Sequence, residues 1–242
     1  MNLGTGGDAS AGNQIDPRPV LIVTGLVQEA RIAAGPGMVV ICSSSDPRQL
    51  RSLLTVFDPS TIRGVISFGV AGGLDPSLKP GDVVLATEVV AGDGRWLAGL
   101  SLNEQVIANL ALKRRVVRGG LAGAEEVIVA QARKAALWLQ TGAAAVDMES
   151  HIAAAYAADA GLPFAALRVI SDSAHRSLPA LAKSAIRPDG KVDLRKILSG
   201  VVRDPTALSA LVSTGIDFNR ALRSLRGCRS FLMGSEGFVA AT

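Results

Sequence analysis

The chain has 242 residues, of which 48% are hydrophobic and only 4% aromatic, and its formal net charge is +4. This length suits one large α/β domain, and no apolar run approaches the roughly 20 residues of a membrane span. One tyrosine and two tryptophans offer few platforms for stacking bases, so a nucleic-acid partner is not expected. The two cysteines have no metal-binding spacing. With no secretory signal either, we expect a reduced, cytoplasmic protein without a bound metal.

Apolar runs bounded by glycine and proline alternate with helical patterns along the chain, which predicts an α/β fold with a largely parallel sheet. The predicted strands cover residues 20–24, 38–42, 63–68, 82–86 and 116–121, and then the two apolar runs that lead into residues 146–150 and 167–173. The predicted helices cover residues 28–34, 47–57, 103–113, 130–141, 150–160, 177–186 and 192–200, with a last helix from residue 204. We expect a single domain over residues 20–230, a flexible N-terminal tail over 1–19 and a C-terminal tail over 231–242.

Acidic residues follow two of the predicted strands. One run ends in Val146-Asp-Met-Glu-Ser150 and the other in Leu167-Arg-Val-Ile-Ser-Asp-Ser173. Ligands of open α/β sheets bind outside the carboxyl ends of the strands, so Glu149 and Asp172 are expected to face one crevice. A carboxyl group at the rim of an apolar sheet is partly desolvated, which favours acid chemistry. The alternative is that both acids only cap helices or turns.

Further polar residues are expected at the same rim. Glu29 and Arg31 follow the first predicted strand. Ser43 to Ser45 stand before a predicted helix with Arg48 in its first turn, which indicates either an anion site or ordinary capping. Residues 69–73 are rich in glycine and let a ligand approach the backbone closely. They lack the G-x-G-x-x-G spacing of a dinucleotide site.

Four segments together resemble the nucleoside phosphorylase superfamily: Phe68-Gly-Val-Ala-Gly-Gly-Leu74, Pro80-Gly-Asp-Val-Val84, Val146-Asp-Met-Glu-Ser150 and Val169-Ile-Ser-Asp-Ser173. They occur in the family's order, and the similarity covers roughly residues 20–180. Within the family the chain resembles the methylthioadenosine/S-adenosylhomocysteine nucleosidase branch. The start from Gly25 to Ala33 looks most like the hopanoid-associated phosphorylases, which act on adenosylhopane.

The resemblance implies a three-layer α/β/α domain with a central mixed twisted sheet, a homo-oligomer with a dimer favoured, and N-glycosidic cleavage without a cofactor. It implies that Glu149 accepts hydrogen bonds from the ribose hydroxyls. Asp172 would donate a proton to purine N7 as adenine leaves, a contribution of ~10²–10⁴-fold for a positioned general acid. The remaining substrate positions that it implies are Met148, Ser171, Gly69, Val70, Ala71, Gly72, Val127, Ile128 and Glu29.

Departures from the family pattern bear on the nucleophile. Hydrolytic relatives carry paired acids after the first strand, whereas here Glu29 is followed by Ala30. Arg31 and Arg48, with Ser43, Ser44 and Ser45, offer groups that suit inorganic phosphate. The family's usual hydroxyl residue is missing from the glycine segment. We therefore expect phosphorolysis with phosphate as co-substrate, unless Glu29 takes over as the hydrolytic base.

A second departure concerns the substrate's 5′ side. Only residues 34–37 separate the first predicted helix from the second strand, where nucleosidases insert a hairpin. The shorter connection leaves the 5′ side of the sugar less covered and open to a bulky 5′-substituent. Adenosylhopane is therefore the expected substrate. A lipid substrate also suggests peripheral membrane contact. The alternatives are a hydrolytic methylthioadenosine/S-adenosylhomocysteine or futalosine nucleosidase, and a non-catalytic nucleoside-binding protein. Open roles remain for Trp96 (a lid or an interface), His175 (a base contact) and Arg168 (an ion pair).

Overall fold

The computed structural model describes residues 16–99, 104–179 and 207–233. Its centre is an eight-stranded sheet of order β2-β1-β3-β7-β6-β4-β5, and β8 pairs with both β3 and β4. The strands are β1 (Val20–Thr24), β2 (Met38–Cys42), β3 (Val65–Gly73), β4 (Val83–Ala91), β5 (Gly94–Leu97), β6 (Val116–Gly123), β7 (Ala145–Asp147) and β8 (Phe164–Asp172). The helices are α1 (Val27–Ala33), α2 (Pro47–Thr55), α3 (Glu104–Ala111), α4 (Gln131–Thr141), α5 (Ser150–Asp159), α7 (Ala207–Gly227) and α8 (Arg229–Met233).

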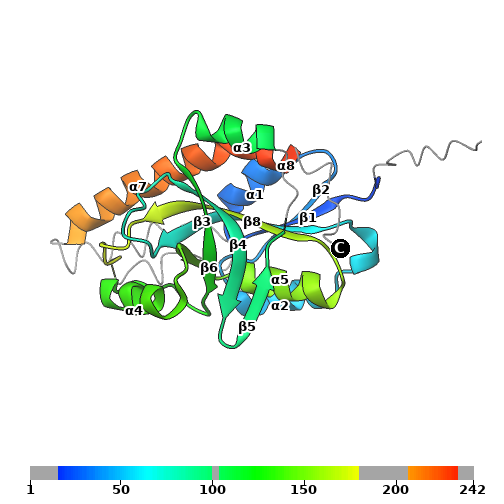
Figure 1. Ribbon diagram of the computed structural model, residues 1–242, viewed down its shortest axis with the longest axis horizontal. Helices are drawn as coiled ribbons and strands as arrows, with labels where there is room; N and C mark the ends of the chain where they lie inside the picture. The colour runs from blue at the N-terminus through cyan, green and yellow to red at the C-terminus, as the bar shows by residue number, and fades with distance from the viewer. Residues whose placement is uncertain (1–15, 100–103, 180–206, 234–242) are drawn as a thin grey trace, which may run out of the picture.

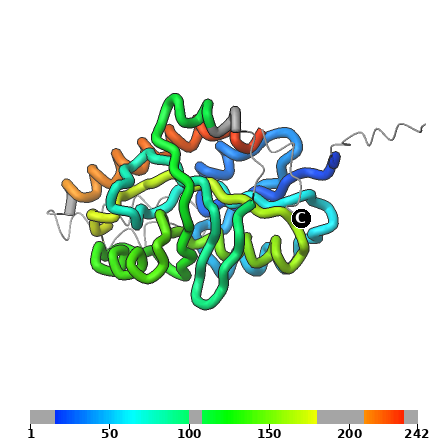
Figure 2. The backbone as a smooth tube through the Cα atoms, viewed as in Figure 1, coloured from blue at the N-terminus to red at the C-terminus, as the bar shows by residue number. Residues whose placement is uncertain are grey.

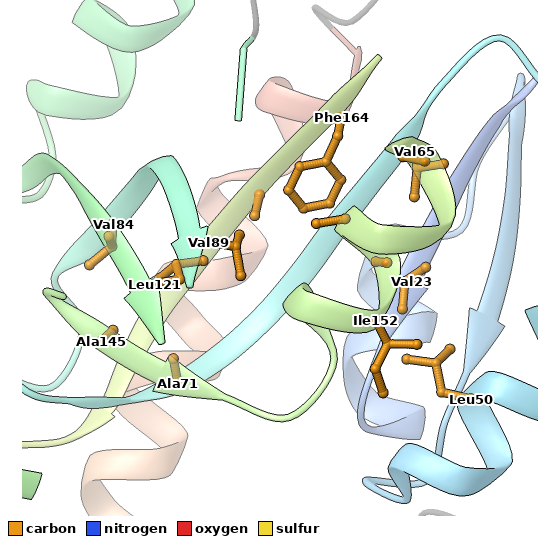
Figure 3. Close-up of a cluster of buried hydrophobic side chains, with 14 of the residues drawn as sticks. Val23, Leu50, Val65, Ala71, Val84, Val89, Leu121, Ala145, Ile152 and Phe164 are labelled. Carbon is orange, nitrogen blue, oxygen red and sulfur yellow. The ribbon is translucent and has the colours of Figure 1, made fainter. Parts of the chain in front are cut away.

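Helices cover the sheet on both faces, with α1, α3, α7 and α8 on one side and α2, α4 and α5 on the other (Figure 1). Strand β1 shows why its sequence is a continuous apolar run, because successive side chains point to opposite faces and both faces are buried. Ile22 packs in the cluster beneath α1, α7 and α8. Val23 packs with Leu50 of α2 and Ile152 of α5 in the other cluster (Figure 3). The predicted three-layer α/β/α architecture with a mixed sheet is confirmed.

Strand β3 organises the sheet because it is paired on both edges. On one edge β8 runs parallel to it from Val65 to Gly72. On the other edge β1 pairs with residues 65–67, and β7 pairs antiparallel with Gly72 and Gly73. None of the described strands pairs with residues 68–71 on this second edge, since β1 and β7 diverge there. In this gap the N–H of Val70 donates to the side chain of Glu29 on α1 at 2.8 Å.

Three predicted elements differ from the structure. The third strand was expected to end at residue 68, but residues 69–73 are the second half of β3 because β8 and β7 pair with them. No strand was predicted around Trp96, whereas it lies in β5, which forms a hairpin with β4. Phe231 and Leu232 fall in the predicted C-terminal tail, yet both are buried in the core. The packed fold therefore extends to Met233.

Two expectations concern the chain after β8. A helix was predicted to begin at Ser177, but residues 177–179 are not helical and the N–H of Leu178 donates to the carbonyl of Val129 at 2.8 Å. The rest of that helix and the one at 192–200 lie outside the described residues. Figure 2 shows that the end of β8 and the first half of α7 lie on the same side of the molecule. Among the residues that the structure describes, no helix is both long and apolar enough to cross a bilayer.

Candidate active site

A cavity of about 310 Å³ lies where β1 and β7 diverge from β3. Its walls come from the ends of β1, β3, β7 and β8, from the loop before α4, and from α7. Glu149 and Asp172 both line it, and each is only 5% exposed. The two acids at the strand ends therefore open onto one shared hollow, as the topology of the sheet requires. We refer to the two regions of its wall as the Glu149 end and the Asp172 end.

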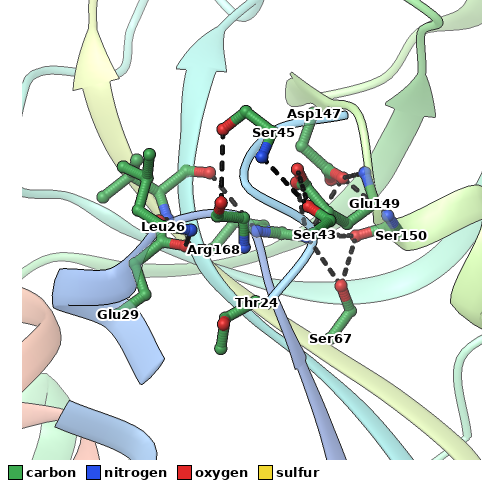
Figure 4. Close-up of polar contacts among 12 residues, drawn as sticks. Thr24, Leu26, Glu29, Ser43, Ser45, Ser67, Asp147, Glu149, Ser150 and Arg168 are labelled. Atoms are coloured by element: carbon green, nitrogen blue, oxygen red, sulfur yellow. Dashed lines mark hydrogen bonds and ion pairs between the residues drawn. The ribbon is translucent and has the colours of Figure 1, made fainter. Parts of the chain in front are cut away.

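The Glu149 end is built on a fully buried arginine (Figure 4). The Arg168 guanidinium lies 3.5 Å from Glu149 Oε2 and 3.0 Å from Asp147 Oδ1. It also donates to Ser67 Oγ at 2.6 Å. Ser43 donates through its hydroxyl to Glu149 Oε1 at 3.2 Å. Burying a guanidinium is costly unless carboxylates surround it, so Arg168 and these acids depend on one another.

Asp147 and Glu149 divide two tasks that the sequence could not separate. Asp147 Oδ1 accepts from the backbone N–H groups of Glu149 (2.8 Å) and Ser150 (2.7 Å), which caps the start of α5. Glu149 itself makes no side-chain capping hydrogen bond. The side chain that caps α5 is therefore that of Asp147, whereas Glu149, for which capping was the alternative, lines the cavity.

The electrostatics of Glu149 follow from this crowding. Burial is the largest effect and raises the pKa of Glu149 from its ordinary 4.5 to about 7. The Arg168 guanidinium and the Ser43 hydroxyl lower that pKa, while the charges of Asp147 and Glu29 raise it further. The carboxyl group thus changes charge close to neutral pH, in the range where a titrating active-site group is useful.

Glu29 joins α1 to β3 and also lines the cavity. Its Oε2 accepts from the N–H groups of Gly25 (2.9 Å) and Leu26 (2.8 Å), and its Oε1 accepts from Val70 N–H at 2.8 Å. Burial raises the pKa of Glu29, and the nearby Arg168 and these N–H donors oppose the shift. Val70 supplies the contact because it lies in the unpaired stretch of β3.

Two glycines make room for these buried charges. A Cβ on Gly25 would lie 2.6 Å from Glu149 Oε1, and one on Gly69 would lie 2.7 Å from both Glu29 and Arg168. No side chain fits at either position without displacing the ionic contacts. Gly69 was expected to face a ligand, but it does not line the cavity and instead accommodates the network behind the wall.

The Asp172 end has a different partner. Ser171 Oγ donates to Asp172 Oδ1 at 2.6 Å, and the ammonium of Lys134 on α4 forms an ion pair with Oδ2. Lys134 is fully buried and also donates to the carbonyl oxygens of Ser173 (3.0 Å) and Arg176 (3.0 Å). The carboxyl group that was expected to act as the acid therefore has a buried cation beside it, which no motif indicated.

The other expected site residues fall into two groups. The cavity is lined by Met148, Ser171, Val70, Ala71, Gly72, Val127, Ile128 and Ser45. Arg31 and Arg48, expected at a phosphate site, are exposed and do not line it, and Ser44 does not line it either. Ser43 is engaged by Glu149 instead. Arg31 and Arg48 lie apart from the cavity because α1 and α2 turn these two side chains to solvent.

The serine segment nevertheless has unusual backbone geometry. Ser44 and Ser45 both adopt left-handed conformations, with φ of 54° and 56°. Such a conformation costs a non-glycine residue about 1–2 kcal/mol. The turn is held because Ser45 N–H donates to the Gly25 carbonyl at 2.8 Å and to Ser43 Oγ at 3.2 Å. The strain positions the Ser43 hydroxyl on Glu149 and brings Ser45 to the wall.

Several wall residues were missed by the sequence analysis. Leu211, Gly215 and Phe218 of α7 line the cavity, about 40 residues beyond Asp172 in the chain. Lys134 had one available signal, because it lies three residues before the half-buried Leu137 on the inward stripe of α4. Trp96 and His175 do not line the cavity. Within the described ranges, no three His, Cys, Asp or Glu side chains are grouped so that they could hold a metal ion.

Comparisons with known proteins agree with this fold. The family described as "Phosphorylase superfamily" matches residues 22–203. No curated protein sequence matches the chain. One similar solved structure is the futalosine hydrolase of Helicobacter pylori strain 26695, with a TM-score of 0.61 and 16% identity over 90% of this chain and 97% of that chain.

Two further solved structures are 5′-methylthioadenosine/S-adenosylhomocysteine nucleosidases. The Helicobacter pylori enzyme with butyl-thio-DADMe-Immucillin-A has a TM-score of 0.62 and 18% identity over 89% of this chain and 96% of that chain. The Neisseria meningitidis enzyme in complex with methylthio-immucillin-A has a TM-score of 0.62 and 17% identity over 90% and 98%. At these identities the likeness shows the common fold.

Proposed function

The chain belongs to the phosphorylase superfamily and is an enzyme of the nucleoside phosphorylase and nucleosidase class, and on that premise we propose that it releases adenine from a 5′-modified adenosine. The observation that carries the proposal is that Glu149 and Asp172 line one cavity from two strand ends. The expected substrate is an adenosine with a large apolar 5′ group, such as adenosylhopane in hopanoid biosynthesis.

The two acids suit opposite sides of an N-glycosidic bond. Cleavage leaves positive charge on the sugar and negative charge on the departing purine. Glu149, when ionised, accepts hydrogen bonds from the ribose hydroxyls and stabilises the positive sugar electrostatically. Asp172 lies at the other end of the wall, where a carboxyl group meets the purine edge and neutralises its charge. Met148 and Ser171 lie next to these acids in the lining.

The nucleophile that we propose is water rather than phosphate. Glu29 lines the cavity with a carboxylate of raised pKa, which suits a base that takes a proton from water. The wall already carries Glu29, Glu149 and Asp172. The buried Arg168 is committed to Asp147 and Glu149, so a phosphate dianion meets unfavourable charge. Phosphorolysis, expected from Arg31 and Arg48, is the alternative.

The apolar 5′ group is supported by the apolar part of the cavity lining. This part includes Leu178, Pro179, Leu211 and Phe218. Apolar surface continues outward along α7, since Ile216 is 56% exposed next to the lining residue Gly215. A cavity of about 310 Å³ is near the lower limit for ligand sites, so it suits the nucleoside while a long hydrocarbon extends along this surface.

The test is adenine release from adenosine, methylthioadenosine and a series of 5′-alkylthioadenosines of increasing chain length, each with and without inorganic phosphate. We expect kcat/KM to rise with alkyl length, because each buried methylene contributes about 0.8 kcal/mol. We expect phosphate to have no effect on the rate.

Two outcomes would count against separate parts of the proposal. Adenine release that depends on phosphate, with a sugar phosphate as product, would replace water by phosphate as nucleophile. Release that is independent of alkyl length would remove the apolar substrate class while leaving nucleoside cleavage intact. A protein that releases no base from any of these nucleosides would be a binding protein rather than the enzyme proposed.

A further inference from the structure

Lys134 is a buried cation with every donor in use. An ammonium group has three N–H donors, and here they meet Asp172 Oδ2, the Ser173 carbonyl (3.0 Å) and the Arg176 carbonyl (3.0 Å). Its side chain is fully buried although it stands on α4 between exposed neighbours. Two neutral carbonyls and one carboxylate stabilise the charged ammonium. Lys134 is therefore held by three contacts directly behind Asp172.

This contact makes the two oxygens of Asp172 unequal. Oδ2 accepts from Lys134, so a proton on the carboxyl group has to reside on Oδ1. Ser171 Oγ lies 2.6 Å from Oδ1 and 3.1 Å from the Ala71 carbonyl oxygen. Its single hydrogen can serve either acceptor. The hydroxyl thus adapts to a protonated or an ionised Oδ1 without moving its oxygen atom.

We propose that Lys134 is the positioning residue of the leaving-group step, an inference that rests on the proposed nucleoside cleavage. When substrate binds, Oδ1 takes a proton from a hydronium ion of the solvent, which leaves as water, and Ser171 donates to Ala71. The C1′–N9 bond then breaks with its electron pair going to the purine, while a second water molecule forms a bond to C1′ and gives its proton to Glu29, which returns it to the solvent. At the same time the Oδ1–H bond breaks, an N7–H bond forms, and the Ser171 hydrogen returns to Oδ1. Lys134 keeps its contact with Oδ2 throughout and stabilises the carboxylate that the transfer produces.

The experiment compares two leaving groups in the Lys134→Met variant. An adenine nucleoside needs a proton on the base to leave, whereas 4-nitrophenyl riboside releases a phenolate that needs none. We expect adenine release to fall by about 10²-fold, the lower range for a positioned general acid, with little change for the nitrophenyl substrate. Asp172→Asn should show the same pattern. Lys113→Met, an exposed lysine outside the cavity lining, is the matched control and should retain both rates.

A structural role for Lys134 would have a different signature. If Lys134→Met slows both substrates equally, or leaves adenine release unchanged, the proposal is wrong. Should that variant not fold, the double variant Lys134→Met/Asp172→Asn removes both members of the buried pair and leaves no unpaired charge. We expect its adenine rate to equal that of Asp172→Asn alone, and a further drop on both substrates would contradict the assignment.

Failure of the underlying function is recognisable separately. A wild-type protein that cleaves neither an adenine nucleoside nor 4-nitrophenyl riboside would refute the proposed function together with this inference. A wild-type protein that cleaves both, with a Lys134→Met variant that does the same, would refute only the role of Lys134.

Discussion

The two ends of the cavity both pair buried carboxylates with a buried cation, but in different ratios. At the Glu149 end, one guanidinium serves Asp147 and Glu149 directly and Glu29 at longer range. At the Asp172 end, one ammonium serves one carboxylate. The shared cation does not compensate three acids, and burial raises the pKa of Glu149 to about 7.

The difference shows how carboxyl groups in the wall of one cavity can have two different roles. Glu149 shares its cation, and its pKa is raised to about 7, first by burial and further by the charges of Asp147 and Glu29. A carboxylate with its own buried ammonium has a fixed partner and a fixed orientation. The number of cations per acid, rather than the choice of Asp or Glu, therefore separates the Glu149 end from the Asp172 end.

The largest effect on stability is expected for Arg168→Met at the Glu149 end. Removing the shared cation leaves buried carboxylates unpaired, which costs about 3–5 kcal/mol of stability for a broken buried pair. Urea unfolding at pH 8 measures this loss. The deficit should shrink at pH 5, because protonated carboxyl groups need no cation.

Arg51→Met is the control for that experiment. Arg51 pairs with Glu125 at 2.5 Å on the surface, where both side chains are largely exposed. A surface pair contributes less than about 1 kcal/mol. If Arg168→Met costs no more than Arg51→Met, the buried network does not stabilise the fold.

A more selective change is Glu149→Gln, which keeps the shape of the side chain and removes its charge. We expect kcat to fall by about 10²–10³-fold, comparable with the loss of one electrostatic contact to a transition state. In the wild type the ionised form is the active one. kcat/KM should therefore fall as pH drops through about 7. The pH profile of adenine release measures both effects.

Ionisation of Glu149 should have the opposite effect on stability: it raises kcat/KM but lowers the free energy of unfolding. A folded pKa of about 7 lies above the ordinary 4.5 of Glu149, so the folded state binds more protons between these values. Stability contributed by this group is then lost as pH rises from about 4.5 to about 7. Glu149→Gln should flatten that slope in urea unfolding. An unchanged slope would mean that Glu149 does not titrate in this range.

The mildest change is Ser43→Ala. The Ser43 hydroxyl donates to Glu149 Oε1 at 3.2 Å, and this hydrogen bond lowers the pKa of Glu149. The substitution removes the hydroxyl, so the pKa should rise. The acidic limb of kcat/KM should move to higher pH by less than about one unit. Ser52→Ala is the matched control, because the Ser52 hydroxyl bonds only its own helix. Identical profiles for the two variants would exclude a role for Ser43 at the Glu149 end.

Much of this arrangement was predictable because it depends on local patterns. Apolar runs placed β1, β2, β7 and β8, and the acids at their ends followed from the topology of α/β sheets. The separate tasks of Asp147 and Glu149 were not predictable, since either can cap a helix from the same position. The location of Arg48 was also misjudged, because a residue in the first turn of a helix can face either solvent or a ligand.

By itself the sequence determined most of the strands and helices and the two acids that the cavity wall presents, since periodicity and turn residues act over short distances along the chain. Only the tertiary structure decided which polar partners each acid obtains. Ser43 and Glu149 are 106 residues apart, and Lys134 and Asp172 are 38 apart. Such contacts depend on the register of β3 with β8 and on how α4 packs against the sheet. The charge of a buried group is thus set by neighbours that no local pattern identifies.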